Sequence, residues 1–285
     1  MRYDYMRKLV VVTGASRGIG LEIAKELARR GAVLVLTARD AATLDQAADS
    51  LPRGSQVAAK IVADLSRADG AEALIAGIEK LGRPVDVFVN NAGSALGGSF
   101  AEESWSRLGG MIALNAVSLA RLTYWAASHM KARGNGRILN VSAVTACQPV
   151  PQFALYSATK AFVTSLSIAI NKELKGTGVK VSALHPPATA TGFADHADIR
   201  STLALRLFGF MRPERVARAA VDGLAAGRLR IIPGLLSKAI WFSSNFTPTS
   251  VGLTVMTILF KRRGARPAAA GLSRIADRPR EVAHG

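Results

Sequence analysis

Tyr156 and Lys160 are four residues apart in the segment Tyr-Ser-Ala-Thr-Lys, which opens a stretch with helical periodicity. Residues four apart lie on one face of an α-helix, so the phenol and the ammonium group face the same space. The reference pKa of a phenol is about 10, and a nearby ammonium group lowers that pKa by favouring the phenolate. The pair is therefore suited to giving a proton to a carbonyl oxygen, or to taking one from an alcohol.

Two polar residues earlier in the chain can complete the same site. Ser142 follows an apolar run, fourteen residues before Tyr156, and its hydroxyl is a candidate for holding the substrate oxygen beside the tyrosine. A serine that caps a turn at a strand end is the alternative interpretation. Asn115 lies in the apolar segment Ala-Leu-Asn-Ala-Val, where a buried amide needs a hydrogen-bonding partner.

A glycine-rich turn, Thr-Gly-Ala-Ser-Arg-Gly-Ile-Gly, occupies residues 13–20 between an apolar run and an amphipathic segment. Glycines let the backbone turn tightly and approach a pyrophosphate, whose charge is favoured by the N-terminus of the following helix. A plain strand-to-helix turn is the alternative for glycines alone. The strand and helix on either side favour a dinucleotide site made by Gly14, Ser16, Arg17, Gly18, Ile19 and Gly20.

The end of the second apolar run distinguishes between the two nicotinamide cofactors. An acidic residue there accepts hydrogen bonds from the ribose 2′-hydroxyl of NAD, whereas a basic residue suits the 2′-phosphate of NADP. This run ends Leu-Thr-Ala-Arg, with Ala38 and Arg39, and Arg17 is a second cation that can face the same phosphate. The two arginines predict NADP(H) in preference to NAD(H). Asp40 is a counter-signal, because it can still reach a ribose.

The elements that must position these residues alternate between short apolar runs and longer helical stretches. This alternation predicts an α/β fold with a doubly wound parallel sheet, the Rossmann fold, of about seven strands in one domain over residues 1–234. Residues 235–260 are expected to form an apolar appendage, and 261–285 a basic, mobile tail. Expected strands cover 9–12, 32–37, 57–63, 85–89, 137–141, 179–184 and 229–232, and expected helices cover 19–30, 43–51, 71–81, 105–131, 156–175 and 213–226.

The glycine spacing T-G-x-x-x-G-x-G, together with Tyr-x-x-x-Lys, resembles the short-chain dehydrogenase/reductase family over about residues 7–234. The resemblance implies that Lys160 also holds the nicotinamide ribose and that Asn115 holds a water linking this lysine to solvent. It implies a catalytic tetrad of Asn115, Ser142, Tyr156 and Lys160. The expected helices 105–131 and 156–175 match those that pair subunits in the family, which implies a homodimer or homotetramer.

The same resemblance implies cofactor contacts outside the glycine turn. Asp64 is expected at the adenine, with help from the backbone of Leu65, and the N-N-A-G segment that includes Asn91, Ala92 and Gly93 is expected to shape the cofactor floor. Pro186, Thr189 and Thr191 are expected beside the nicotinamide, with Thr191 at its carboxamide. Pro187 stands where the family has glycine, and because proline fixes φ and lacks an N–H we expect the local backbone to differ. His185, just before, is interpreted as a packing histidine.

Apolar residues favour a hydrophobic substrate. Residues 192–212, expected to lie over the site, contain many apolar side chains and few acids, as does the segment that follows Ser142. Such a lining suits a hydrophobic ketone, a 3-oxoacyl group or an alcohol better than a sugar, with ordinary lid packing as the alternative. Residues 213–217 and 227–234 also resemble a subgroup of the family that reduces lipophilic ketones.

Composition excludes several other classes. A chain of 285 residues with 49% hydrophobic residues can bury a core, and a single cysteine with four histidines excludes a disulfide framework and a zinc cluster. The net charge of +17 raises nucleic acid or an anionic membrane as partners, and residues 200–285 hold 15 basic and 4 acidic side chains. The sequence has no nucleic-acid recognition motif. Residues 261–263, Lys-Arg-Arg, suit anionic headgroups, with a solvated tail as the alternative.

These patterns together predict a cytoplasmic NADP(H)-dependent oxidoreductase that holds no metal. The substrate is expected to be a small hydrophobic carbonyl compound or alcohol. No nucleic-acid partner is expected, and peripheral contact with a membrane is kept as an alternative to a free tail. The alternative is a non-catalytic NADP(H)-binding regulator or scaffold, which would need no poised tyrosine.

Overall fold

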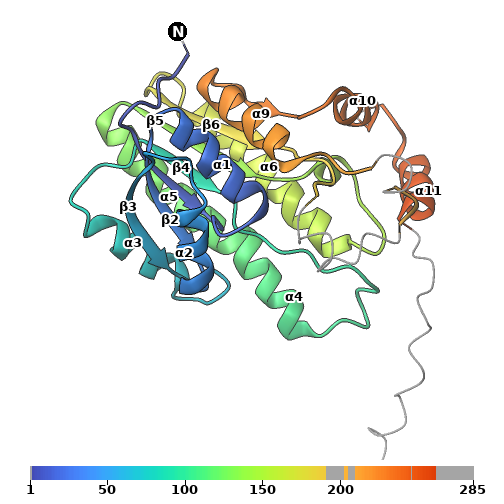
Figure 1. Cartoon of the computed structure of the whole chain (residues 1–285). Helices are drawn as coiled ribbons and strands as arrows, with labels where there is room; N and C mark the ends of the chain where they lie inside the picture. The colour runs from blue at the N-terminus through green and yellow to red at the C-terminus, as the bar shows by residue number, and fades with distance from the viewer. Residues whose placement is uncertain (1, 191–201, 205–208, 245, 261–285) are drawn as a thin grey trace, which may run out of the picture.

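A seven-stranded parallel sheet forms the centre of the molecule, with strand order β3-β2-β1-β4-β5-β6-β7 (Figure 1). The structure is a computed structural model, and it describes residues 2–190, 202–204, 209–244 and 246–260. The predicted doubly wound Rossmann fold is confirmed. The strands are β1 (Leu9–Thr13), β2 (Val33–Ala38), β3 (Gln56–Val62), β4 (Val87–Asn90), β5 (Gly136–Val141), β6 (Val179–Leu184) and β7 (Arg230–Ile231).

Helices cover both faces of the sheet. Helices α1 (Gly18–Arg29), α2 (Ala41–Asp49) and α9 (Pro213–Ala225) pack on one face through a core that includes Leu27, Leu44 and Val216. Helices α3 (Gly70–Glu79), α5 (Leu119–Arg133) and α6 (Ala154–Glu173) pack on the other face, with Leu74 and Trp125 among the core residues. Strands β1, β2 and β4 are buried on both sides, which explains their continuous apolar runs, whereas the edge strand β3 is largely exposed.

One predicted helix is interrupted. The stretch expected as one helix over 105–131 consists of α4 (Trp105–Ile112), a π-helical segment η1 (Ala113–Ser118) and α5. A π-helical segment widens the helix locally and is frequently found at functional sites, and this one contains Asn115. The other predicted strands and helices end within two residues of the observed bounds.

The carboxyl ends of the strands form the edge at which the site is built. The chain order reverses between β1 and β4, which leaves a crevice beside the glycine turn, the usual place for a ligand in such sheets. Beyond the sheet, α10 (Leu235–Ser244) and α11 (Thr249–Leu259) lie at one end of the molecule (Figure 1). Within the described residues, no helix combines the length and the apolar character needed to cross a bilayer.

Candidate active site

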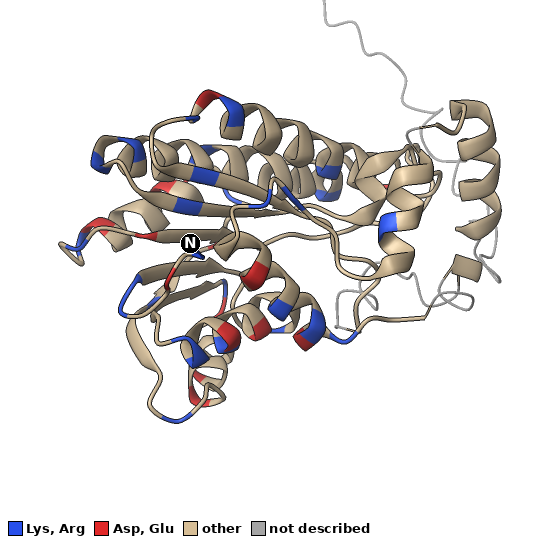
Figure 2. Ribbon diagram, turned by 90° about the horizontal axis from the view of Figure 1, so that it is seen from above, with Lys and Arg blue, Asp and Glu red and all other residues tan. Residues whose placement is uncertain are grey.

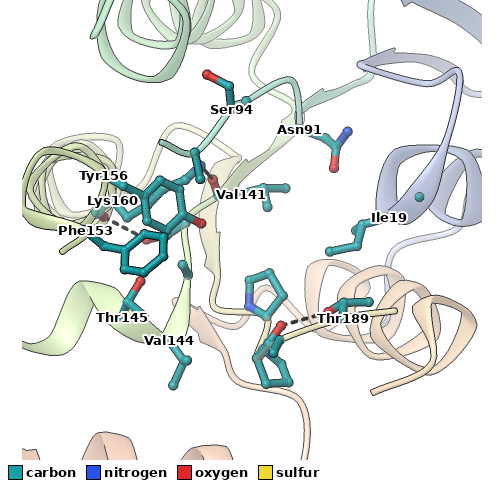
Figure 3. A pocket seen from close by; sticks show the side chains of 18 of the residues that line it. Ile19, Asn91, Ser94, Val141, Val144, Thr145, Phe153, Tyr156, Lys160 and Thr189 are labelled. Atoms are coloured by element: carbon teal, nitrogen blue, oxygen red, sulfur yellow. Dashed lines mark hydrogen bonds between the residues drawn. The ribbon is translucent and has the colours of Figure 1, made fainter. Parts of the chain in front are cut away.

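A cavity of about 1690 Å³ opens along the carboxyl ends of the strands and extends from the glycine turn to α10 and α11. Figure 3 shows Ile19 on one side of it and Tyr156, Lys160 and Thr145 on the other. Gly20, Asp64 and Asn115 are outside the lining, and Thr191 falls outside the described residues. The sequence-predicted residues that line the cavity are Gly14, Ser16, Arg17, Gly18, Ile19, Arg39, Leu65, Asn91, Ala92, Gly93, Ser142, Tyr156, Lys160, Pro186 and Thr189.

The glycine turn is held against the end of β4. The Asn91 Nδ2 donates hydrogen bonds to the backbone oxygens of Thr13 at 2.9 Å and Gly14 at 3.1 Å. Gly14 adopts a φ of 63°, a conformation that glycine takes without steric cost. A Cβ on Gly20 would overlap Asn91 Nδ2 and the Gly14 oxygen. The turn therefore requires glycine at position 20 for packing, and Asn91 acts by fixing the backbone that faces the cavity.

The cavity rim near β2 carries two exposed arginines. Arg17 and Arg39 both line the cavity, and neither forms an ion pair with another described residue. The nearby Asp40 carboxylate accepts a hydrogen bond from Thr43 N at 2.8 Å and caps α2. Because the only nearby acid in this lining is used as a cap, the rim presents two guanidinium groups that suit an anionic group.

Asp64 is bonded to its own loop. Its carboxylate accepts hydrogen bonds from Ser66 N at 3.0 Å and from Ser66 Oγ at 2.6 Å. These hydrogen bonds hold the pKa of Asp64 below its ordinary value. Ala63, Leu65 and Ser66 line the cavity on either side of it. Leu65 lines the cavity, and the adenine contacts expected of Asp64 and Leu65 stay predictions.

Tyr156 and Lys160 lie on one face of α6 and both line the cavity. Lys160 is buried, its Nζ donates a hydrogen bond to Val141 O at 2.9 Å, and Nζ lies 5.8 Å from the centre of the Tyr156 ring. Burial lowers the pKa of Lys160 to about 8 and raises the pKa of Tyr156. The predicted lowering of the Tyr156 pKa is therefore not seen in the protein alone, because burial disfavours the charged phenolate.

Asn115 is fully buried in η1, and every polar atom of its amide has a partner. Its Oδ1 accepts a hydrogen bond from Ser94 N at 2.9 Å, and its Nδ2 donates to Ser94 O at 2.8 Å and to Thr159 Oγ1 at 3.2 Å. The amide thus ties the segment after β4 to α6, and the satisfied partners explain how an amide is tolerated in an apolar helix. The water-mediated link to Lys160 stays a prediction.

Ser142 faces α6 instead of the reacting centre. The residue is 2% exposed, its Oγ donates to Lys160 O at 2.7 Å, and the same oxygen lies 2.8 Å from Thr164 Oγ1. A serine hydroxyl has one hydrogen to donate, and here that hydrogen is used within the helix packing. The Ser142 hydroxyl is therefore engaged with α6 in the protein alone, and its role in holding the substrate oxygen stays a prediction. The next residue, Ala143, lines the cavity and has no hydroxyl.

Thr145 is a cavity residue that the sequence did not single out. It lies in η2 (Val144–Cys147), a short 3₁₀ turn after β5 that packs against α6. Its Oγ1 is buried and has no hydrogen-bond partner, and Figure 3 shows this hydroxyl pointing toward the side chains of Phe153 and Tyr156. No spacing rule marks a threonine in such a turn, so only the fold could reveal it.

The segment after β6 forms part of the cavity wall. Thr189 Oγ1 donates to Pro187 O at 2.8 Å, and Pro186 O accepts from Val144 N at 3.1 Å, so both prolines help to fix the cavity wall. His185 is fully buried, with its ring centroid 4.2 Å from that of Trp241. Burial lowers the pKa of His185 to about 4, so the ring is neutral near pH 7 and acts as a packing residue.

The wall farthest from the glycine turn is apolar and comes from the two C-terminal helices. Residues 235–260 contain one charged side chain, Lys238, and Figure 2 shows these helices almost without charge. The predicted lid over 192–212 lies mostly outside the described residues. The apolar residues that α10, α11 and the next position contribute to the lining are Leu235, Leu236, Ile240, Val255, Met256, Leu259 and Phe260.

A glycine turn at the switch point of a parallel sheet, in one cavity with a partly buried tyrosine and a buried lysine, defines a dinucleotide-binding oxidoreductase. The family model for short chain dehydrogenases matches residues 8–201. The chain belongs to this family, which binds a nicotinamide cofactor and acts on CH–OH or C=O groups.

Curated relatives and solved structures that resemble this chain are also oxidoreductases, and the solved structures share its fold. The chain is 35% identical over 261 residues to the very-long-chain 3-oxoacyl-CoA reductase of Anas platyrhynchos, covering 88% of this chain and 78% of that protein. A short-chain dehydrogenase from Sphingobium yanoikuyae in complex with NADPH matches with a TM-score of 0.75 and 32% identity, over 92% of this chain and 99% of that one. A 3-ketoacyl-(acyl-carrier-protein) reductase from Brucella melitensis complexed with NADH matches with a TM-score of 0.70 and 27% identity, over 80% and 95% of the two chains.

Proposed function

We propose that this protein is an NADP(H)-dependent oxidoreductase that interconverts a hydrophobic ketone, or a 3-oxoacyl-type substrate, and its secondary alcohol. The observation that carries the proposal is one continuous cavity with cations at one end, apolar helices at the other, and Tyr156 and Lys160 between them. A cofactor at the glycine turn and a lipophilic substrate against α10 and α11 would meet at these two residues. The proposal therefore rests on a charged end for the cofactor and an apolar end for the substrate within one cavity.

The residues at the nucleotide end suit NADP(H). Arg17 and Arg39 are exposed and unpaired among the described residues, which fits a 2′-phosphate, and the Asp40 carboxylate already caps α2. The glycine turn offers backbone N–H groups at the N-terminus of α1 for the pyrophosphate. When bound, the nicotinamide supplies or takes the hydride. The Sphingobium neighbour holds NADPH and the Brucella neighbour holds NADH, so the preference rests on the arginines.

The tyrosine is placed to handle the proton. In the direction of reduction, the Tyr156 O–H bond breaks and its proton forms the new O–H bond of the alcohol, while hydride adds to the carbonyl carbon. Burial keeps the phenol protonated near neutral pH, which suits a proton donor. Lys160, held by Val141 O, keeps a positive charge near the phenolate that remains and stabilises it.

The substrate class is argued from the apolar wall. A cavity lined by aliphatic and aromatic residues binds an acyl chain or a bulky ketone through burial of apolar surface. The Anas relative is named for a very-long-chain 3-oxoacyl substrate and the Brucella neighbour for a 3-ketoacyl group, and both fit this wall. A sugar would leave its hydroxyl groups without partners there.

A test compares NADPH and NADH oxidation with a panel of aromatic ketones, aliphatic ketones and 3-oxoacyl thioesters. The expected result is turnover with NADPH, increasing with the apolar size of the substrate. Binding of NADPH without turnover of any panel member, or of the matching alcohols with NADP⁺, would instead support a non-catalytic cofactor-binding protein. A preference for NADH would contradict the role given to Arg17 and Arg39.

We also propose a homodimer or homotetramer. Val117, Tyr124 and Phe162, on η1, α5 and α6, are 61%, 68% and 44% exposed, and apolar exposure of this extent on long helices suits a subunit contact. Tyr124→Glu is expected to shift the sedimentation coefficient toward that of a monomer. A wild-type protein that sediments as a monomer would contradict this proposal.

A peripheral contact with an anionic membrane is a further proposal. Leu235, Phe242 and Phe246 on and near α10 are 83%, 67% and 73% exposed, and no acidic residue occurs in 235–260. Co-sedimentation with phosphatidylglycerol vesicles, weakened by Phe242→Ser, is the expected result. Equal recovery in the supernatant with and without vesicles would contradict it.

A further inference from the structure

Carbonyl reduction is favoured by a hydrogen-bond donor to the substrate oxygen besides Tyr156, and the hydroxyl predicted for this role, that of Ser142, is engaged with α6. The Ser142 hydroxyl lies within hydrogen-bonding distance of Lys160 O and Thr164 Oγ1, both on α6. The Thr164 hydroxyl in turn donates to Lys160 O at 3.0 Å. These three groups satisfy one another inside the protein, so turning the Ser142 hydroxyl toward a substrate would break a buried hydrogen bond.

The neighbouring position cannot replace it. Successive side chains at the end of a strand point in opposite directions, and the residue after Ser142 is Ala143, which lines the cavity with a methyl group. The Ala143 oxygen is used as well, since it lies 3.3 Å from His185 Nδ1. Ser142 also lines the cavity, but its hydroxyl is engaged with α6, so the two residues after β5 offer the substrate no free hydroxyl.

Thr145, two residues further on, has the properties that Ser142 lacks. Seven buried side-chain polar atoms in the described part of the chain have no hydrogen-bond partner, and only those of Thr37 and Thr145 belong to residues that line the cavity. Thr37 ends β2, at the nucleotide end of the cavity. Thr145 lies on η2, which packs against α6, and its hydroxyl points toward Phe153 and Tyr156 (Figure 3).

Other cavity hydroxyls near the tyrosine are directed elsewhere. The Thr189 hydroxyl donates to Pro187 O, and Figure 3 shows the Ser94 side chain turned away from Tyr156. A buried hydroxyl without a partner costs free energy, and such a cost is commonly retained where a ligand supplies the missing partner. The oxygen of a carbonyl substrate, placed to receive the Tyr156 proton, is such a partner.

We infer that Thr145 replaces Ser142 as the residue that donates a hydrogen bond to the substrate oxygen during hydride transfer. The inference rests on the proposed carbonyl reduction and adds no bond change to it. The Thr145 O–H remains intact, the proton still comes from Tyr156, and the hydroxyl stabilises the negative charge that develops on oxygen as hydride arrives. As a β-branched residue, threonine also restricts the rotation about χ1 that positions its hydroxyl.

Three variants test the assignment: Thr145→Val, Thr145→Ser and Ser142→Ala. Steady-state kinetics with NADPH and the best ketone of the panel, NADPH affinity by fluorescence and thermal unfolding are measured for each. Thr145→Val keeps the shape and removes the hydroxyl, so kcat is expected to fall about 100-fold with unchanged NADPH affinity. Thr145→Ser is expected to restore most of kcat.

Ser142→Ala is expected to unfold at a lower temperature while its kcat stays close to that of the wild type, because its hydroxyl serves the packing of α6. A Thr145→Val variant that binds NADPH and retains wild-type kcat would overturn the inference, as would a Ser142→Ala variant that loses kcat while folded and NADPH-bound. If the wild type turns over the ketone, either of these two results would overturn the role of Thr145 and leave the proposed reaction supported. A wild type that binds NADPH and reduces no panel member would remove both the inference and the proposed reaction.

Discussion

The two ends of the cavity hold their charges in different environments. At the nucleotide end, Arg17 and Arg39 are exposed on the rim and have no ionic partner among the described residues. At the substrate end, Lys160 lines the cavity and His185 precedes the lining residue Pro186; both are buried, and their pKa values are lowered to about 8 and about 4. The nucleotide end is therefore suited to recognising charge from solvent, and the substrate end to proton transfer in a dry environment.

The largest expected effect comes from removing the phenol at the substrate end. Tyr156→Phe deletes the proton donor and leaves the ring, so kcat is expected to fall about 1000-fold while NADPH affinity changes little. Tyr124→Phe, on the exposed face of α5, is the matched control and is expected to keep wild-type kcat. Stopped-flow oxidation of NADPH with the best ketone measures both. A Tyr156→Phe variant with wild-type turnover would show that the proton comes from another group.

A second prediction concerns the stability of the substrate end in acid. The pKa of His185 is about 4 in the folded protein and 6.5 when exposed, so the unfolded chain binds more protons between these pH values. The contribution of neutral His185 to the free energy of unfolding is fully present above pH 6.5. It is expected to fall by up to about 3 kcal/mol as the pH drops to 4. Urea unfolding between pH 4 and pH 6.5 measures the slope of the free energy of unfolding against pH.

The matched variants for this slope are His185→Phe and His129→Phe. The first keeps a ring against Trp241 but cannot titrate, so its stability is expected to fall less steeply in acid than that of the wild type. The second replaces an exposed histidine on α5 and is the control for exchanging a histidine for phenylalanine. Parallel slopes for His185→Phe and the wild type would show that acid acts through other groups.

A third prediction tests the packing of the nucleotide end. Gly20→Ala places a Cβ against backbone and Asn91, which cannot easily move, so a loss of about 2 kcal/mol of folding stability and weaker NADPH binding are expected. Gly109→Ala, in α4, meets no atom within 4 Å and is expected to stabilise the protein slightly. Denaturant unfolding and NADPH titration compare the two variants. Equal effects would mean that the turn tolerates a side chain.

The two ends also differ in how far the sequence predicts them. The glycine turn, its flanking strand and helix, and the spacing of Tyr156 and Lys160 are local features, because helix periodicity and backbone geometry act over a few residues. The sheet followed from the same local patterns. Local sequence also predicted a cavity-facing position for Arg39, and the structure places it in the lining.

Side-chain direction at the substrate end depends on contacts between distant segments. The Ser142 hydroxyl turns to Thr164, 22 residues along the chain, and no pattern around residue 142 encodes that partner. Similarly, burial reverses the expected direction of the Tyr156 pKa shift, and the apolar wall comes from α10 and α11, about 80 to 100 residues further along. Such features require the assembled fold, because they arise from tertiary packing instead of local propensity.

The smallest expected effect concerns the exposed arginines. It tests whether they recognise the charge of the 2′-phosphate of NADPH. Arg17→Ala and Arg39→Ala are each expected to weaken NADPH binding about tenfold, since a solvent-exposed guanidinium loses part of its attraction to screening. NADH, which lacks the 2′-phosphate, is expected to bind each variant as it binds the wild type. Arg53→Ala, exposed and outside the cavity lining, is the control for a general loss of positive charge. Equal weakening of NADPH and NADH would mean that the arginines hold the pyrophosphate or the fold, and that the cofactor preference has another source.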